Sequence, residues 1–98
     1  MSNLTGELLV SLGFKKDGYT NLSYDYYLDK KEYSIFINLK STCDKHGGIV
    51  IYNNDHNNKR VVRLEDRKSY PRPIEFTIED LKAAIRLAEI NFEIDALE

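Results

Sequence analysis

A tyrosine-rich segment, residues 19–39, constrains the fold more than any other part of this chain. It holds five of the seven tyrosines, and polar and apolar residues alternate along it with a period of two. Such alternation predicts two β-strands, each with one face toward a core. Asp29, Lys30 and Lys31 interrupt the pattern and predict a turn. The segment is therefore expected to form an antiparallel hairpin.

The alternation also assigns each side chain of the two predicted strands, residues 19–28 and 32–40, to a face. The core-facing positions are Leu22, Tyr24, Tyr26 and Leu28, then Tyr33, Ile35, Ile37 and Leu39. The opposite face carries Asn21, Ser23, Asp25 and Tyr27, then Ser34, Phe36, Asn38 and Lys40. We expect this opposite face to be largely solvated, as is typical of antiparallel sheets.

Capping signals predict a short helix over residues 5–12. Thr5 can accept a hydrogen bond from the first turn as the N-cap residue. Gly13 stands where a left-handed residue commonly ends a helix, and Phe14 follows, able to fold back on Leu9. Residues 15–18 are predicted to form a polar turn.

A second helix is predicted from Ile78 to about Ile94. Thr77 and Asp80 have the spacing of a capping box, in which each side chain bonds the other residue's backbone N–H. The apolar stripe of this helix consists of Ile78, Leu81, Ile85, Ala88 and Phe92.

The residue pattern in the middle of the chain, from residue 49 to residue 76, predicts two or three further strands. One covers residues 49–52, after Gly47 and Gly48 in a turn that uses positive φ. The next covers residues 60–65, after a polar turn at residues 53–58, and a short edge strand over residues 74–76 completes the sheet. The expected fold is a single α+β domain over residues 1–98. An antiparallel meander of four to five strands has both helices on one face.

Composition excludes several classes of protein. The net charge of −2 argues against binding nucleic acid through global charge and against a strongly acidic DNA mimic. A single cysteine, Cys43, excludes an intrachain disulfide and favours a reducing compartment. We find neither a signal peptide nor an apolar run long enough for a membrane span, and expect a cytoplasmic protein without membrane contact.

The residue types that support catalysis or metal binding are few. Cys43 and His46 have a metal-like local spacing, but His56 is expected at the other end of the sheet, beyond the strand at residues 49–52. A Cys–His nucleophile pair would lack an orienting group other than Asp44. We therefore predict no enzyme, no metal site and no cofactor.

Residues 59–72 form a basic segment, with six basic residues against two acidic ones. Basic side chains with an interleaved tyrosine can hold phosphates and stack a base, although a solvated edge with locally paired charges explains the same pattern. The nucleic-acid-binding candidates are Arg60, Arg63, Arg67, Lys68, Tyr70 and Arg72.

Three aromatic residues are candidates for a binding surface. Tyr27 and Phe36 fall on the predicted open face, and Tyr52 or its neighbours can join them there. Aromatic side chains favour partner contacts because they bury a large area with little loss of entropy. The alternative is cross-strand pairing that only stabilises the sheet.

The spacing Leu9-x-x-Leu12-Gly13-Phe14, followed by the tyrosine-rich hairpin and a final T-x-x-D helix, resembles the layout of small uncharacterised proteins of phages and bacterial mobile elements. This resemblance covers most of the chain. It implies an accessory protein that acts by binding, and it assigns no functional residue.

The leading functional hypothesis is a non-catalytic accessory or inhibitor-type protein. It would bind another protein through the open sheet face or an edge strand, and self-association into a homo-oligomer is one form of this. The alternative is a nucleic-acid-binding accessory domain that uses the basic segment.

Overall fold

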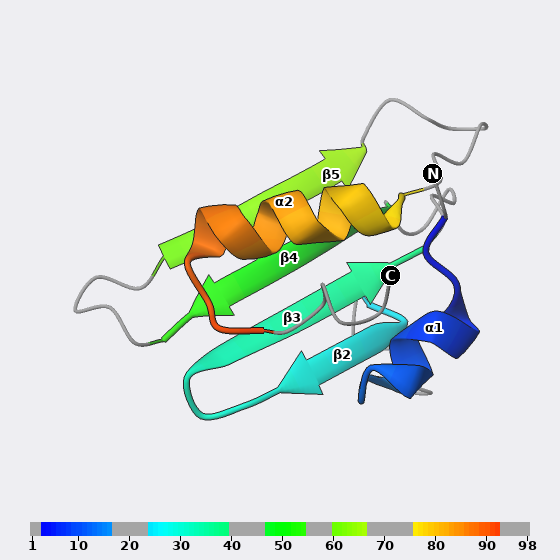
Figure 1. The fold of residues 1–98 in the computed structure, drawn as a ribbon, viewed down its shortest axis with the longest axis horizontal. Coiled ribbons are helices and arrows are strands. Elements are labelled where there is room, and N and C mark those ends of the chain that lie inside the picture. The colour runs from blue at the N-terminus through cyan, green and yellow to red at the C-terminus, as the bar shows by residue number, and fades with distance from the viewer. Residues whose placement is uncertain (1–2, 17–23, 40–46, 55–59, 67–75, 93–98) are drawn as a thin grey trace.

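The fold is a five-stranded antiparallel sheet with two helices, seen in a computed structural model that describes residues 3–16, 24–39, 47–54, 60–66 and 76–92 (Figure 1). The strands are β1 (Lys15–Lys16), β2 (Tyr26–Asp29), β3 (Tyr33–Asn38), β4 (Gly47–Asn53) and β5 (Arg60–Asp66). The helices are α1 (Gly6–Ser11) and α2 (Ile78–Ala88). The strands lie in chain order, β1-β2-β3-β4-β5, so the predicted α+β meander is confirmed.

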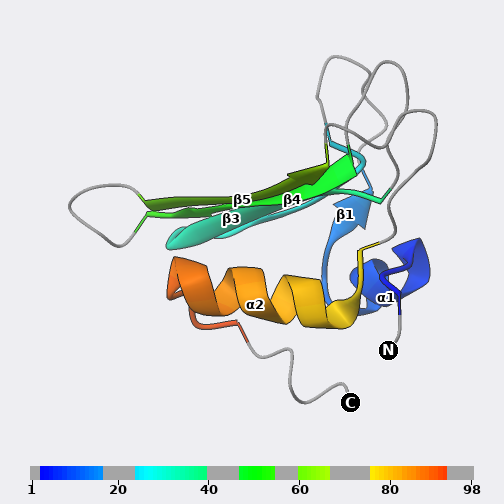
Figure 2. The same ribbon diagram turned by 90° about the horizontal axis from the view of Figure 1, so that it is seen from above.

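The sheet and the helices form two layers, with both helices on the same side of the sheet (Figure 2). The core lies between these layers, and its largest fully buried side chains come from α1, β3, β4 and α2: Leu9, Ile35, Ile37, Ile49, Ile51 and Leu81. The residues that the alternation assigned to the core face of β3 are therefore the residues that pack against the helices.

α1 has the predicted caps. The Thr5 side chain accepts a hydrogen bond from the Leu8 N–H (3.1 Å). Gly13 is left-handed at φ 100°, and the Phe14 N–H donates to the Leu9 carbonyl (2.9 Å). This is the Schellman geometry, in which a left-handed residue lets the chain satisfy the last helical carbonyls.

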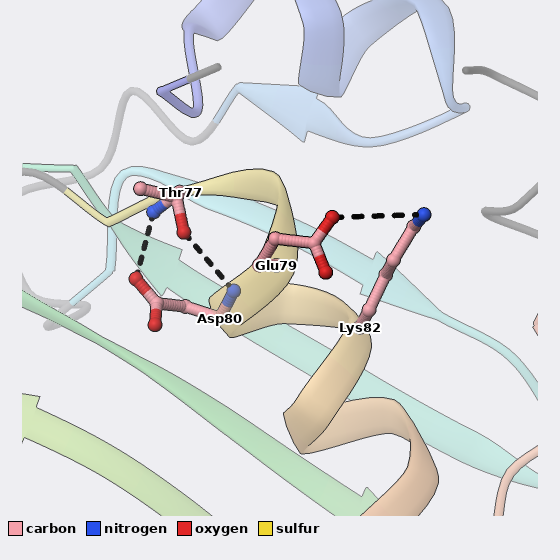
Figure 3. Close-up of polar contacts among 4 residues, drawn as sticks. All are labelled: Thr77, Glu79, Asp80 and Lys82. Atoms are coloured by element: carbon pink, nitrogen blue, oxygen red, sulfur yellow. Dashed lines mark hydrogen bonds and ion pairs between the residues drawn. The ribbon is translucent and has the colours of Figure 1, made fainter. Parts of the chain in front are cut away.

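α2 begins with the predicted capping box (Figure 3). The Thr77 N–H donates to Asp80 Oδ2 (2.8 Å), and the Asp80 N–H donates to Thr77 Oγ1 (3.2 Å). One turn on, Lys82 is buried on this helix, with its Nζ 3.9 Å from Glu79 Oε1. Both helical starts thus follow from local sequence.

The end of α2 differs from the prediction. The helix stops at Ala88 rather than near Ile94, because Glu89 is left-handed (φ 57°, ψ 36°). The Asn53 amide of β4 donates to the carbonyls of Ala88 (2.6 Å) and Glu89 (3.3 Å), which satisfies them without a further helical turn. Phe92, predicted on the helical stripe, lies beyond the helix.

Phe92 instead folds back on the core side of the sheet. Its ring centroid lies 6.2 Å from that of Phe14 and 6.2 Å from that of Tyr33, both in edge-to-face geometry. The chain after α2 therefore packs against both Phe14, which follows α1, and Tyr33, the first residue of β3.

Lys15 and Lys16, predicted as a turn, form the edge strand β1, opposite Tyr27 and Tyr26. A two-residue strand has too little pattern to be seen in the sequence, and it forms here because β2 offers a free edge.

One further prediction about the sheet is wrong, and a second is tested only at Phe76. Gly47 and Gly48 belong to β4, and among the described glycines positive φ occurs at Gly13. Phe76 lies outside the five strands; its carbonyl accepts from the Leu4 N–H (2.8 Å), so the chain before α2 is held by the N-terminal segment. The rest of the short strand predicted over residues 74–76 lies outside the described residues.

Candidate functional site

A row of side chains crosses all five strands on the face of the sheet away from α2. The register places these residues opposite one another in the order Lys15, Tyr27, Phe36, Val50 and Arg63. Directly opposed residues of antiparallel strands point to the same face. We call this set the central row.

Two more tyrosines lie beside Phe36 on this face. The Phe36 ring meets the Tyr52 ring edge to face, with centroids 5.8 Å apart. Its centroid also lies 5.6 Å from that of Tyr24, with the rings tilted by 42°. All are partly buried, as is Tyr27 opposite Phe36. We call Tyr24, Tyr27, Phe36 and Tyr52 the aromatic cluster; it brings together the three residues predicted as a binding surface.

Tyr24 is the member that the sequence placed on the wrong face. The alternation assigned it to the core with Tyr26, but its ring contacts Phe36. β2 begins only at Tyr26, and Asp25 lies at a bend where its N–H donates to Asn38 Oδ1 (2.7 Å). The bend breaks the period-two pattern, so Tyr24 turns to the other face.

The expectation that this face is largely solvated is also wrong. Val50 is 0% exposed, Asn38 2% and Ser34 8%. β3 and β4 are interior strands, and in the register Val50 lies between the larger Phe36 and Arg63. Asn38 stands opposite Gly48 and accepts a hydrogen bond from the Asp25 N–H. The Ser34 hydroxyl donates to Asp29 Oδ1 on β2 (2.6 Å). The face has a packed centre and an exposed periphery.

The periphery carries charge at both ends of the central row. Lys15 on β1 and Arg63 on β5 are both exposed. They stand four strand spacings apart, or about 19 Å at roughly 4.8 Å per spacing. Val61 adds an apolar side chain, 41% exposed, opposite Tyr52. An aromatic centre is thus bordered by two cations.

The residues predicted for nucleic-acid binding are only partly placed. Arg63 lies on the same face as the aromatic cluster, and Arg60 begins β5. Arg67, Lys68, Tyr70 and Arg72 lie outside the described residues, as do Cys43, His46 and His56. In the part of the chain that the structure describes, no three His, Cys, Asp or Glu side chains are grouped to hold a metal ion.

A hollow of about 760 Å³ lies beside α1, where that helix meets β1 and β2. It is lined by Thr5, Gly6, Glu7, Val10, Lys16 and Tyr26. Its charged lining residues, Glu7 and Lys16, have opposite signs, so the hollow as a whole does not favour a ligand of either charge.

Sequence reasoning missed two parts of the site. Lys15 joins the central row only through the β1–β2 pairing, and Tyr24 joins the aromatic cluster only through the bend at Asp25. Neither has a sequence signal of its own. Phe36 and Tyr27, by contrast, follow from alternation alone.

Comparison of the chain with protein-family models, with curated proteins and with solved structures finds no match. Neither α1 nor α2, the helices of the described segments, has the length and apolar character needed to cross a membrane.

Proposed function

We propose that this chain is a non-catalytic protein-binding domain, of accessory or inhibitor type, that acts in the cytoplasm through the open sheet face. The observation that carries the proposal is the aromatic cluster on the face away from α2. Four partly buried rings are in place there before any partner binds.

Aromatic residues in such positions suit a protein interface. Tyrosine and phenylalanine are enriched at the centres of interfaces, where a few anchors supply most of the binding energy. Because Phe36 is held between Tyr24 and Tyr52, these rings lose little further freedom on binding. The cluster is therefore a pre-organised contact surface.

Binding suits these residues better than turnover does. The groups that the described strands gather on this face are aromatic rings, valines, the polar side chains of Ser34 and Asn38, and charged residues at the periphery. Nucleophilic catalysis requires a nucleophile beside a base that is itself oriented by a third group. Ser34 is 8% exposed and stands opposite Tyr52, and its hydroxyl donates to Asp29, which suits a structural role.

The test is a double variant, Tyr27→Ser/Phe36→Ser, with Val10→Ser as the matched control. Val10 is 55% exposed on α1, so its loss removes apolar surface away from this face. Circular dichroism would verify the fold of each variant. Affinity purification from the native host would measure partner capture, and native mass spectrometry would measure the oligomeric state. We expect at least a tenfold loss of capture or assembly in the double variant alone. Unchanged capture and unchanged oligomer mass would refute the proposal.

Nucleic-acid binding is the second candidate, because Arg63 of the basic segment stands on the aromatic face, in the central row. Base stacking on aromatic rings with phosphates held by cations would use both groups. A mobility shift with single- and double-stranded oligonucleotides at low salt tests it, and the absence of a shift would exclude it.

A further inference from the structure

We propose that the hollow beside α1 binds a small zwitterion with an apolar body, the chemistry shared by a free apolar α-amino acid and a short peptide of such residues. The hollow is lined by α1, which lies on the helix side of the sheet (Figure 2). The inference is therefore independent of the protein binding proposed for the open face. The volume of about 760 Å³ falls within the roughly 300–1,000 Å³ that is common for ligand sites.

Two walls of the hollow carry opposite charges. Glu7 belongs to α1 and Lys16 to β1, and both residues are exposed. A ligand that carries both an ammonium and a carboxylate can satisfy both walls at once, with its ammonium on Glu7 and its carboxylate on Lys16. A ligand with a single charge would be repelled by one of these walls. Charge complementarity therefore selects a zwitterion.

Tyr26 adds a hydroxyl beside Lys16. The two residues are direct cross-strand partners of β1 and β2, and Tyr26 packs against the core, so both side chains share the helix face of the sheet. The Lys16 ammonium and the Tyr26 hydroxyl can then both donate to one carboxylate. Gly6 lets α1 lie close to this ring, because a Cβ at that position would overlap the Tyr26 hydroxyl. The hydroxyl thus lies at the surface of the helix, within the hollow.

The remaining lining can hold an apolar side chain. Val10 is 55% exposed and lies three residues after Glu7, so the two occupy the same side of α1. The Tyr26 ring is partly buried and lines the hollow from β2. A ligand side chain that covers Val10 and this ring would displace water from both. The lining therefore favours leucine over glycine.

The direct test is a titration of the full chain with L-leucine at neutral pH, followed by nuclear magnetic resonance of the backbone amides. The amides expected to shift are those of the hollow: Gly6, Glu7, Lys16 and Tyr26. N-acetyl-L-leucine lacks the ammonium and L-leucine amide lacks the carboxylate, so each should bind roughly threefold to fivefold more weakly. Glycine, which lacks the side chain, should also bind more weakly. Leucyl-leucine distinguishes the two sources, because the tighter of the two ligands identifies a free amino acid or a peptide.

Variants assign each contact. Glu7→Gln should remove the preference for L-leucine over N-acetyl-L-leucine, and Lys16→Gln should remove the preference over L-leucine amide. Tyr26→Phe keeps the ring and should weaken binding of L-leucine more than that of L-leucine amide. The matched controls are Lys31→Gln and Glu32→Gln, at exposed positions between β2 and β3, and they should leave every affinity unchanged.

Several results would overturn the inference. They are the absence of amide shifts at millimolar L-leucine, shifts confined to residues away from the hollow, and binding of the two blocked analogues as tight as that of L-leucine. Preferences that survive in folded Glu7→Gln and Lys16→Gln, or that are lost in the control variants as well, would also overturn it.

Discussion

Asn53 offers a sharp test of how the two layers are joined. Asn53 is 2% exposed, and its amide donates to the carbonyls of Ala88, the last residue of α2, and of Glu89, the C-cap residue. Asn53→Asp keeps the shape of the side chain but replaces the donor by a carboxylate. That carboxylate would face two carbonyl oxygens at the negative end of the helix dipole.

The expected cost follows from these contacts. Leaving buried hydrogen-bonding groups unsatisfied costs roughly 1–3 kcal/mol, and the cost is larger where a charge is involved. Repulsion from the helix end adds about 0.3–1 kcal/mol. We therefore expect Asn53→Asp to lower the free energy of unfolding by about 2–4 kcal/mol at neutral pH. This is a large part of the roughly 5–15 kcal/mol typical of a domain.

Urea unfolding followed by circular dichroism measures the effect, and Asn54→Asp is the matched control. Asn54 is the next residue and its side chain is exposed, so its substitution should cost less than about 0.5 kcal/mol. The difference between the two variants should narrow in mild acid, because a protonated carboxyl regains a donor. Equal stability of the two variants at neutral pH would refute the capping role of Asn53.

Two further predictions concern stability. Glu89→Gly should raise the free energy of unfolding by about 0.5–1 kcal/mol, because glycine adopts the left-handed conformation without strain. Glu79→Gly, in the first turn of α2, should instead lower the free energy of unfolding. Urea unfolding in which Glu89→Gly is less stable than Glu79→Gly would contradict this reasoning. Burial raises the pKa of Tyr33, and Glu32 raises it further, so the unfolded chain loses this proton first. Stability should therefore fall as pH rises through about 10, and less steeply in Tyr33→Phe; equal slopes in alkaline urea titrations would disprove this.

The alternation of polar and apolar residues predicts the centre of the candidate site. Tyr27 and Phe36 were assigned to the open face because side chains in a strand alternate between faces, and the register places them opposite each other. The periphery was not predictable. Lys15 reaches the central row through a pairing of two residues, too short to leave a periodic pattern. Tyr24 reaches the aromatic cluster through a bend at Asp25, whose N–H bonds to Asn38, thirteen positions from Asp25.

Local sequence determined the starts of both helices, the left-handed Gly13 and the alternating faces of β2 and β3. Each of these depends on groups within a few residues of one another, such as Thr77 with Asp80. Only the tertiary structure decided where α2 ends, because its last carbonyls bond to Asn53 on a distant strand. It also decided that Val50 is buried on the face away from the helices, since burial depends on neighbours across strands that the order of residues does not reveal.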